Sequence, residues 1–176
     1  MDPKIIQVML DLETMGVESN SVICSIGAVK FDITKPEETA TIDEFYCTID
    51  AKDCHQHGLV FSQTTIDWWK KQDPAVLQAL RKDNVTLIEG LSRFSSWFGG
   101  KSLPTWGNGA GFDNVILENA YKAVGMKRPW LPWDDRCYRT VKNLIMVPPP
   151  SQIGTYHNAL DDARYQTKHL LMMLHS

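Results

Sequence analysis

The amino-acid sequence predicts an α/β fold in which a mixed sheet of five strands carries helices on both faces. Three observations lead to this prediction. Apolar runs rich in β-branched residues fill the first 50 residues, apolar positions recur at helical spacing after residue 60, and short apolar stretches separate the later helices. Three strands in succession indicate an antiparallel meander at the start of the chain. The alternating helices and strands that follow indicate parallel strands that extend the same sheet.

The first three strands are expected at residues 4–13, 21–32 and 41–50. Their sequences are "KIIQVMLDLE", "SVICSIGAVKFD" and "TIDEFYCTID". Short connections between them predict an antiparallel meander. The segment "KPEET" is typical of a turn, because Pro36 lacks the N–H that a central strand position requires.

Two helical segments follow the meander. Residues 62–82 have apolar side chains at roughly helical spacing, and we expect a break or kink near Pro74. Residues 86–98 predict a second amphipathic helix. Thr86 with Glu89 three residues later is a capping-box pattern at its start.

The second half of the chain alternates between strands and helices. Residues 102–109 predict a short strand that ends in a glycine-rich turn, and residues 112–125 predict a helix. Residues 129–145 indicate a strand or turn followed by a short helix. The proline-rich residues 147–154 predict a stiff connector to the last helix, at residues 158–174.

Length and composition indicate one globular domain that spans residues 1–176. The 43% hydrophobic and 22% charged content is ordinary for a folded protein. No apolar run approaches the roughly 20 residues of a membrane span, so we expect no membrane association. The N-terminal sequence lacks the pattern of a secretory signal, and the four cysteines form no CxxC pair. Both features favour the reducing cytoplasm.

The cysteines are expected to be structural. Cys24 and Cys47 lie in apolar, strand-like runs and are predicted to be buried free thiols. The motif "CHQH" at residues 54–57 could begin a metal site, but no second CxxC or HxxxH accompanies it. A polar loop is the favoured interpretation of this motif.

Charge is unevenly distributed along the chain. The net charge of −3 argues against a protein that binds nucleic acid indiscriminately through a basic surface. Residues 121–142 nevertheless carry an excess of basic side chains, which form either a solvated helix face or a rim that contacts phosphate. Arg136 could contact phosphate or could pair with Asp134 or Asp135.

Two carboxylates stand at the end of the first predicted strand. Asp11 and Glu13 are two residues apart, so they point to the same face of the strand. Neighbouring carboxylates repel each other, and a partly buried pair favours nearby cations. The alternative is an acidic pair at the protein surface.

A third carboxylate, Asp113, follows a glycine-rich turn at the start of a predicted helix. A strand, turn and helix in this order would direct Asp113 to the carboxyl end of the sheet. Its alternative role is a helix cap beside the positive end of the helix dipole. The spacing of the glycines is not G-x-G-x-x-G, so a dinucleotide-binding loop is excluded.

The segment "YHNALDDARYQ" adds a histidine and a fourth carboxylate. Five residues correspond to about 500° of rotation within a helix. His157 and Asp162 therefore meet only if His157 precedes the helix, and Asp161 is then expected to point elsewhere as a capping residue. Clustered carboxylates suit Mg²⁺ or Mn²⁺, which as a pair assist phosphodiester hydrolysis. A nearby histidine could deprotonate the attacking water.

These motifs together resemble those of the DEDDh-type 3′→5′ exonucleases. "DLET" begins at Asp11, "GNGAGFD" supplies Asn108 and Asp113, and "HNALDDA" supplies His157 and Asp162. The three motifs occur in the family's order and span nearly the whole chain. The sequences "LDLETMG", "IDWWKKQ" and "WGNGAGFDNVILENAY" also resemble phage and prophage exonucleases, which group with a mycobacterial 3′→5′ exoribonuclease.

The resemblance implies an RNase H-like sheet, two divalent metal ions (Mg²⁺ or Mn²⁺), and release of nucleoside 5′-monophosphates from 3′ ends of single-stranded DNA or RNA. It implies bacterial or phage-infected host cytoplasm as the location and, more weakly, a homodimer. The residues that it assigns to metal binding are Asp11, Glu13, Asp113 and Asp162, and His157 is the general base. The alternative function is a proofreading or accessory subunit, or a nucleic-acid-binding module, whose main role is partner binding.

Five residues are expected to contact the substrate. The backbone at Thr14 and Met15, directly after the acidic pair, is expected to pass beside the metal ions. Asn108 belongs to the second motif, and the indole of Trp68 could stack on a base. An arginine near the site could bind phosphate. The predicted substrate-binding residues are Thr14, Met15, Asn108, Trp68 and Arg139. We expect Trp69 and Trp106 to belong to the core.

Overall fold

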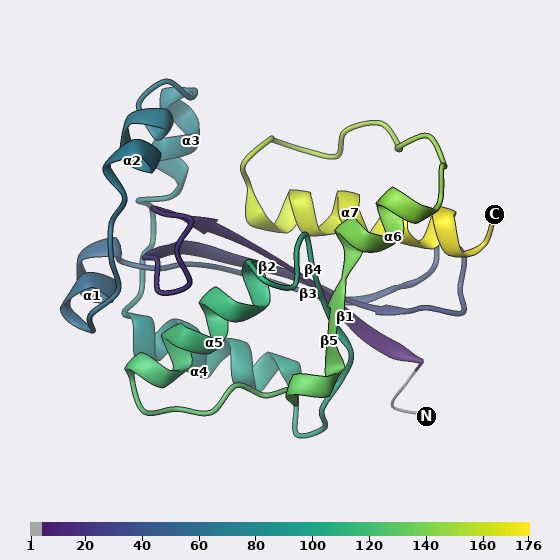
Figure 1. The fold of residues 1–176 in the computed structure, drawn as a ribbon, viewed down its shortest axis with the longest axis horizontal. Coiled ribbons are helices and arrows are strands. Elements are labelled where there is room, and N and C mark those ends of the chain that lie inside the picture. The colour runs from purple at the N-terminus through teal and green to yellow at the C-terminus, as the bar shows by residue number, and fades with distance from the viewer. Residues whose placement is uncertain (1–4) are drawn as a thin grey trace.

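A computed structural model describes residues 5–176, and it confirms the mixed five-stranded sheet (Figure 1). The strands lie in the order β3-β2-β1-β4-β5. β1 (Ile6–Thr14) pairs antiparallel with β2 (Ile23–Asp32), which pairs antiparallel with β3 (Thr41–Thr48). β4 (Thr105–Gly107) and β5 (Asp135–Cys137) continue the sheet in parallel to β1.

The central strand β1 is buried on both faces of the sheet. Val8, Met9 and Leu10 are fully buried, as expected for a strand that is covered by helices on both sides. The strands β4 and β5 have three residues each, in agreement with the short strand expected within residues 102–109 and the strand or turn expected within residues 129–145. Residue 4, which the sequence placed in the first strand, lies outside the described residues.

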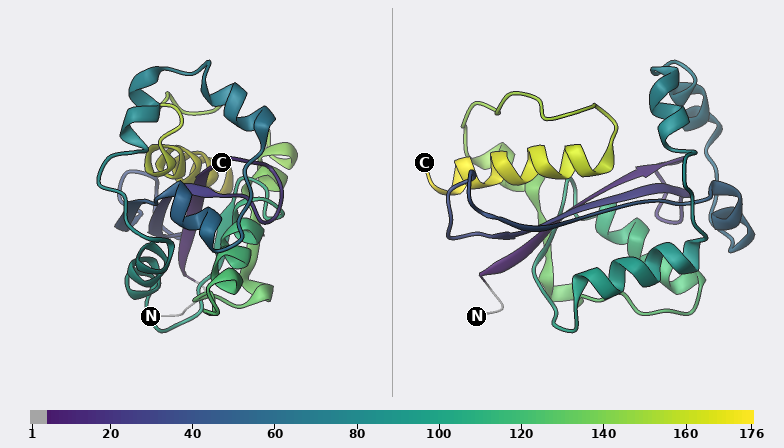
Figure 2. Two further views of the ribbon diagram at one scale, coloured as in Figure 1. Left: turned by 90° about the vertical axis from the view of Figure 1, so that its left-hand side faces the viewer. Right: turned by 180° about the vertical axis from the view of Figure 1, so that it is seen from behind.

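Helices cover the two faces of the sheet (Figure 2). α4 (Leu87–Phe98) and α5 (Asp113–Ala123) pack on the face that carries Leu10 and Leu12. α6 (Tyr138–Leu144) and α7 (Ala159–Leu174) pack on the opposite face, around Met9. Asp11 and Glu13 alternate with Leu10 and Leu12, so they point toward the side of α7.

Three short helices stand at one end of the sheet, beside the end of β1 (Figure 1). α2 (Gln63–Trp69) and α3 (Pro74–Ala79) confirm the expected break near Pro74, and the Asp73 side chain accepts a hydrogen bond from the Ala75 N–H at the start of α3. α1 (Ala51–Gln56) contains most of the "CHQH" motif, so the prediction of a polar loop there was wrong.

The physical reason for the extra helix is a local cap. The Asp50 side chain accepts hydrogen bonds from Lys52 N and Asp53 N, and this starts α1. Cys54 then turns inward and is fully buried, with its Sγ 3.4 Å from the Ile23 carbonyl oxygen. The thiol belongs to the core, and "CHQH" is not among the groups of described residues that could hold a metal.

One of the two hydrogen bonds of the predicted capping box is present at the start of α4. The Thr86 hydroxyl accepts a hydrogen bond from the Glu89 N–H at 3.3 Å. The Glu89 side chain, however, pairs with Arg93 one turn later and does not reach back to Thr86. A short 3₁₀ helix, η1 (Pro132–Asp134), leads into β5.

The predicted core residues are buried. Cys24 and Cys47 are buried free thiols, and Trp69 and Trp106 are both less than a tenth exposed. Within residues 5–176, no helix combines the length and the apolar character that crossing a membrane would require.

Candidate active site

Four of the five predicted catalytic residues line a cavity of about 360 Å³ at the carboxyl end of β1, and the fifth, Asp113, is not among its lining residues. β1 contributes two carboxylates, the turn after β4 contributes an amide, and the start of α7 contributes a histidine and a further carboxylate. The lining includes Asp11, Glu13, Asn108, His157, Asp162 and Gln166. Residues that are far apart in the sequence therefore meet at one place, as the spacing of the motifs predicted.

Asp11 is held by a contact that the sequence did not reveal. Its Oδ1 atom accepts a hydrogen bond of 2.7 Å from Nε2 of Gln166, which is buried on α7. Gln166 lies four residues after Asp162, one helical turn further along the same face of α7. That spacing is the only signal in the sequence that could have indicated its role.

Asp113 is the first residue of α5, and its carboxylate bonds to β1. Its Oδ1 atom accepts a hydrogen bond from Leu12 N–H at 3.2 Å, whereas Oδ2 is buried without a hydrogen-bond partner. The structure places Phe112 at the N-cap and shows no side-chain cap there, so the capping alternative for Asp113 was wrong. A side chain at Gly107 would lie within 3.1 Å of Asp113 Cβ, which explains the glycine before the turn.

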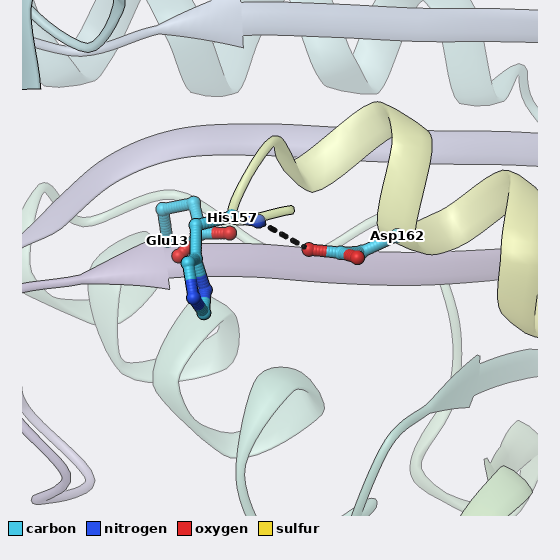
Figure 3. Close-up of side chains that lie close together, drawn as sticks. All are labelled: Glu13, His157 and Asp162. Carbon is cyan, nitrogen blue, oxygen red and sulfur yellow. Dashed lines mark hydrogen bonds between the residues drawn. The ribbon is translucent and has the colours of Figure 1, made fainter. Parts of the chain in front are cut away.

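His157 lies directly before α7, with its backbone in the left-handed region at φ 63°. Its N–H donates a hydrogen bond of 3.1 Å to Asp162 Oδ2 (Figure 3). Potential ligand atoms of Glu13, His157 and Asp162 all lie within 4.8 Å of one another. The expected convergence of the histidine and the carboxylate is therefore present.

The ring of His157 is positioned by two neighbouring indoles. The Trp68 and Trp69 rings lie edge-on to it, with centroids at 5.0 and 5.8 Å. Among the described residues, neither ring nitrogen of His157 has a hydrogen-bond partner. The ring is thus oriented by packing while its nitrogens stay available.

Asp161 does not cap α7, contrary to the prediction. Asn158 is the N-cap, and its Oδ1 accepts hydrogen bonds from Leu160 N and Asp161 N, each at 3.1 Å. The Asp161 carboxylate instead binds Thr155 N–H and Arg164. It does point away from the cavity, as expected.

Burial raises the pKa values of all four carboxyl groups, and repulsion from the other site carboxylates adds to this at Asp11 and Glu13. Burial, followed by repulsion from Asp113, Glu13 and Asp162, raises the pKa of Asp11 well above its usual range. Burial and the same kind of repulsion raise the pKa of Glu13 to about 8. Burial raises the pKa of Asp113 to about 7 and also raises that of Asp162.

This electrostatic arrangement fits divalent cations. Carboxylate oxygens are the hard ligands that Mg²⁺ and Mn²⁺ prefer. The unpaired buried Oδ2 of Asp113 and the crowding of Glu13 with Asp162 leave negative charge that the described residues do not neutralise. The residues present can therefore hold such ions.

A second cavity, of about 420 Å³, adjoins the first and shares Leu12 and Glu13 with it. Thr14 and Trp68 line this cavity, and Trp68 is 42% exposed. Trp69 is buried, and its Nε1–H donates a hydrogen bond of 2.9 Å to the Thr14 carbonyl. The two adjacent indoles therefore have different environments, with Trp69 in the core and Trp68 at an open surface.

The remaining predicted contacts lie around the two cavities. Met15 lines a third cavity, of about 550 Å³, on the other side of Trp69 and packs into the core. Asn108 lines the cavity of the carboxylates, and its carbonyl oxygen accepts a hydrogen bond of 2.6 Å from Arg139. Arg139 is exposed on α6. Substrate binding by these residues stays a prediction.

Arg136 pairs with neither acidic neighbour. It donates hydrogen bonds to the carbonyl oxygens of Trp133 and Asp135, whereas the Asp135 carboxylate binds the buried Arg128 guanidinium at 3.1 Å. Part of the basic stretch is therefore structural. Five further polar residues that the sequence analysis did not assign to the site line the cavity of the carboxylates: Tyr138, Lys142, Gln152, Tyr156 and Tyr165.

Residues 6–174 match the family described as the 3′-5′ exoribonuclease Rv2179c-like domain. The chain belongs to this family. Membership identifies it as a 3′-5′ exonuclease, which is a hydrolase, and confirms the DEDDh resemblance. Comparison with curated proteins finds no match.

Solved exonuclease structures share the fold of this family member. The nuclease domain of 3′hExo, a DEDDh family member bound to rAMP, is 15% identical with a TM-score of 0.64, and the match covers 98% of this chain and 92% of that one. The zinc-bound E. coli ExoI–ssDNA complex is 12% identical with a TM-score of 0.63, and the match covers 93% and 39% of the two chains. The chain thus spans about two-fifths of that exonuclease I chain. At these identities the likeness shows the fold alone.

Proposed function

We propose that this exonuclease hydrolyses the last phosphodiester bond at the 3′ end of single-stranded nucleic acid and releases a nucleoside 5′-monophosphate. The observation that carries the proposal is the meeting of three carboxylates and His157 in one cavity, with the Asp113 carboxylate bonded to Leu12 N–H between Asp11 and Glu13. The family description supports RNA as the substrate, and the single-stranded DNA bound by the structurally similar E. coli ExoI supports a single strand.

Two divalent cations, Mg²⁺ or Mn²⁺, are proposed as cofactors. Asp11, Glu13 and Asp162 would hold one ion, and Asp11 with a contribution from Asp113 would serve the other. When bound, such ions neutralise charge that develops on the phosphate and favour ionisation of the attacking water. The raised pKa values of these carboxyl groups support the assignment, because repelling carboxylates gain most from a cation.

His157 is proposed as the general base. Its two ring nitrogens have no hydrogen-bond partner among the described residues, and its ring lies beside Glu13 and Asp162 (Figure 3). A ring nitrogen can accept a proton from the attacking water near neutral pH. The backbone N–H of His157 donates a hydrogen bond to Asp162, which fixes the backbone and leaves the ring nitrogens available for the proton.

The neighbouring cavity of about 420 Å³ is proposed to receive the terminal nucleoside. Its exposed indole, Trp68, offers a face on which a base can stack. Arg139, beside Asn108, is proposed to contact a backbone phosphate. The buried free cysteines support a reducing cytoplasm as the location, and the homodimer that the resemblance implies stays a prediction.

Turnover of matched labelled oligonucleotides tests the proposal. RNA and DNA substrates of one sequence, single- and double-stranded, are incubated with Mg²⁺, with Mn²⁺ or with a chelator. We expect stepwise release of nucleoside 5′-monophosphates from single-stranded RNA with either metal, and none with the chelator or in Asp113→Ala. Failure of every substrate with every metal would favour a binding module instead.

A further inference from the structure

Two consecutive acidic residues at the start of α7 each hold a backbone N–H of the segment that precedes the helix. Asp162 Oδ2 accepts from His157 N–H at 3.1 Å, and Asp161 Oδ2 accepts from Thr155 N–H at 2.9 Å. Successive helical residues are rotated by about 100° about the helix axis, so the two carboxylates bind the segment from different directions. The segment that carries His157 is thus fixed at two points.

Asp161 is in turn tied to the edge strand of the sheet. Its Oδ1 accepts a hydrogen bond of 2.9 Å from Nη1 of Arg164. The same guanidinium donates from Nε and Nη2 to the two carboxylate oxygens of Glu44 on β3, at 2.9 and 2.5 Å. Such two-point contacts restrict orientation as well as distance. We call these three residues the Glu44–Arg164–Asp161 bridge.

The backbone beside Asp161 is fitted to this arrangement. Gly154 has φ 60°, and a Cβ atom there would lie 2.1 Å from Asp161 Oδ2. His157, three residues later, has a left-handed backbone at φ 63°, which a non-glycine residue adopts only when its surroundings enforce it. The bonds from His157 N–H to Asp162 and from Thr155 N–H to Asp161 hold the backbone on either side of Tyr156.

We propose that the Glu44–Arg164–Asp161 bridge positions His157 for proton transfer, as a set of positioning residues that touch neither substrate nor metal. This inference rests on the proposed function, in which His157 is the base. Loss of the bridge frees Thr155, so that only the bond to Asp162 and the packing against the two indoles still hold His157, and its ring is less precisely placed beside Glu13. Substrate binding depends on other residues, such as Trp68 and Arg139, and is expected to survive.

The kinetic test is Asp161→Ala compared with Glu89→Ala. Glu89 forms an exposed pair with Arg93 on α4, far from the cavity, and is the matched control. We expect Asp161→Ala to lower kcat by about 10- to 100-fold, because small misplacements of a reacting group have effects of this size. KM should stay within about threefold, since the loss falls on proton transfer. Glu89→Ala should change neither constant.

A conservative series at Arg164 separates positioning from general stability. Arg164→Lys keeps the positive charge and one donor nitrogen but loses the planar fork of the guanidinium, whereas Arg164→Met keeps only the bulk. We expect Arg164→Lys to retain more kcat than Arg164→Met at similar thermal stability. Equal activity of both with the wild type, or wild-type kcat in Asp161→Ala, would overturn the proposal while the proposed function stands.

A structural measurement keeps the two hypotheses apart. Proton NMR signals of the His157 ring, assigned with His157→Gln, and amide exchange at Thr155 report the segment directly. We expect both to change in Asp161→Ala and in Glu44→Gln, which also serves if Asp161→Ala does not fold. A wild-type protein without hydrolysis would defeat the proposed function, whereas unchanged ring signals would defeat the positioning role.

Discussion

The Oδ1 atom of Asp113 accepts a hydrogen bond of 3.2 Å from the N–H of Leu12, although 101 residues separate them. Leu12 stands between Asp11 and Glu13, so this bond fixes the start of α5 against the strand that carries both carboxylates. The other oxygen, Oδ2, is buried without a hydrogen-bond partner. Asp113 therefore joins two elements and also leaves one oxygen available for a cation.

Replacement of Asp113 by asparagine should separate these two roles. Asn retains an oxygen that can accept from Leu12 N–H but removes the negative charge. We expect turnover with Mg²⁺ to fall by at least about 100-fold, because charge stabilisation by a metal contributes several kcal/mol. Asp113→Ala, which also loses the hydrogen bond, should be less stable to heat than Asp113→Asn. Turnover by Asp113→Asn at the wild-type rate would contradict the assignment.

The crowded carboxylates predict an unusual pH dependence of stability in the metal-free protein. Burial and repulsion raise the pKa of Glu13 from 4.5 to about 8, and burial raises that of Asp113 from 3.8 to about 7. Between the unfolded and folded pKa values, the folded state binds more protons than the unfolded state. Stability therefore falls as pH rises through this window. We expect the melting temperature in a chelator to decrease from about pH 5 to about pH 8.

Metal addition and a charge-removing variant control this measurement. Mg²⁺ should raise the melting temperature more at pH 8 than at pH 5, because only ionised carboxylates bind it well. Glu13→Gln should flatten the pH dependence in the chelator. A melting temperature that rises steadily with pH in the metal-free wild type would show that the pKa values of these carboxyl groups are not raised by folding.

His157→Ala should reduce kcat by about 10²- to 10⁴-fold, the usual contribution of a general base. The protein should keep its fold, since the hydrogen bond to Asp162 comes from the backbone N–H and survives the substitution. His55→Ala is the matched control, because His55 lies on α1 and bonds only to the nearby Leu59 carbonyl. Single-turnover kinetics at pH 7.5 measure the rate of hydrolysis by His157→Ala and by His55→Ala. Near-normal turnover in His157→Ala would exclude the role.

Local patterns were sufficient to predict much of the fold and the shared face of Asp11 and Glu13, whereas the meeting of carboxylates from three elements was expected from the three motifs taken together. Alternation along β1 placed Asp11 and Glu13 on one face, and that face is the one that looks toward α7. The break at Pro74 followed from the geometry of proline. The alternation along β1 and the break at Pro74 could be predicted because each depends on residues that are close together in the sequence.

Contacts between distant segments could not be predicted in the same way. Arg164 and Glu44 are 120 residues apart, and Gln166 and Asp11 are 155 apart, so no local spacing marks either pair. Asp161 was assigned to a helix cap because its neighbours favour caps, but Asn158 already occupies that position. Tertiary contacts, rather than local propensity, determine what such polar side chains bind.

The two adjacent indoles Trp68 and Trp69 should respond differently to truncation. Trp68 is 42% exposed on the cavity proposed for the terminal nucleoside, and stacking of a base contributes about 1–3 kcal/mol. Trp68→Ala should therefore weaken binding of a single-stranded oligonucleotide by about fivefold or more, with little change in unfolding free energy. Trp69→Ala should instead destabilise the fold by about 3–5 kcal/mol, because it empties a buried site.

Binding is best measured by fluorescence anisotropy in an Asp113→Asn background, so that the oligonucleotide is not hydrolysed. Chemical denaturation supplies the unfolding free energy of each variant. Trp133→Ala is a matched control, because Trp133 is 72% exposed in η1 and lines neither cavity at the end of β1. If Trp68→Ala binds as tightly as Trp133→Ala, the exposed indole does not stack on the substrate, and the second cavity requires another ligand contact.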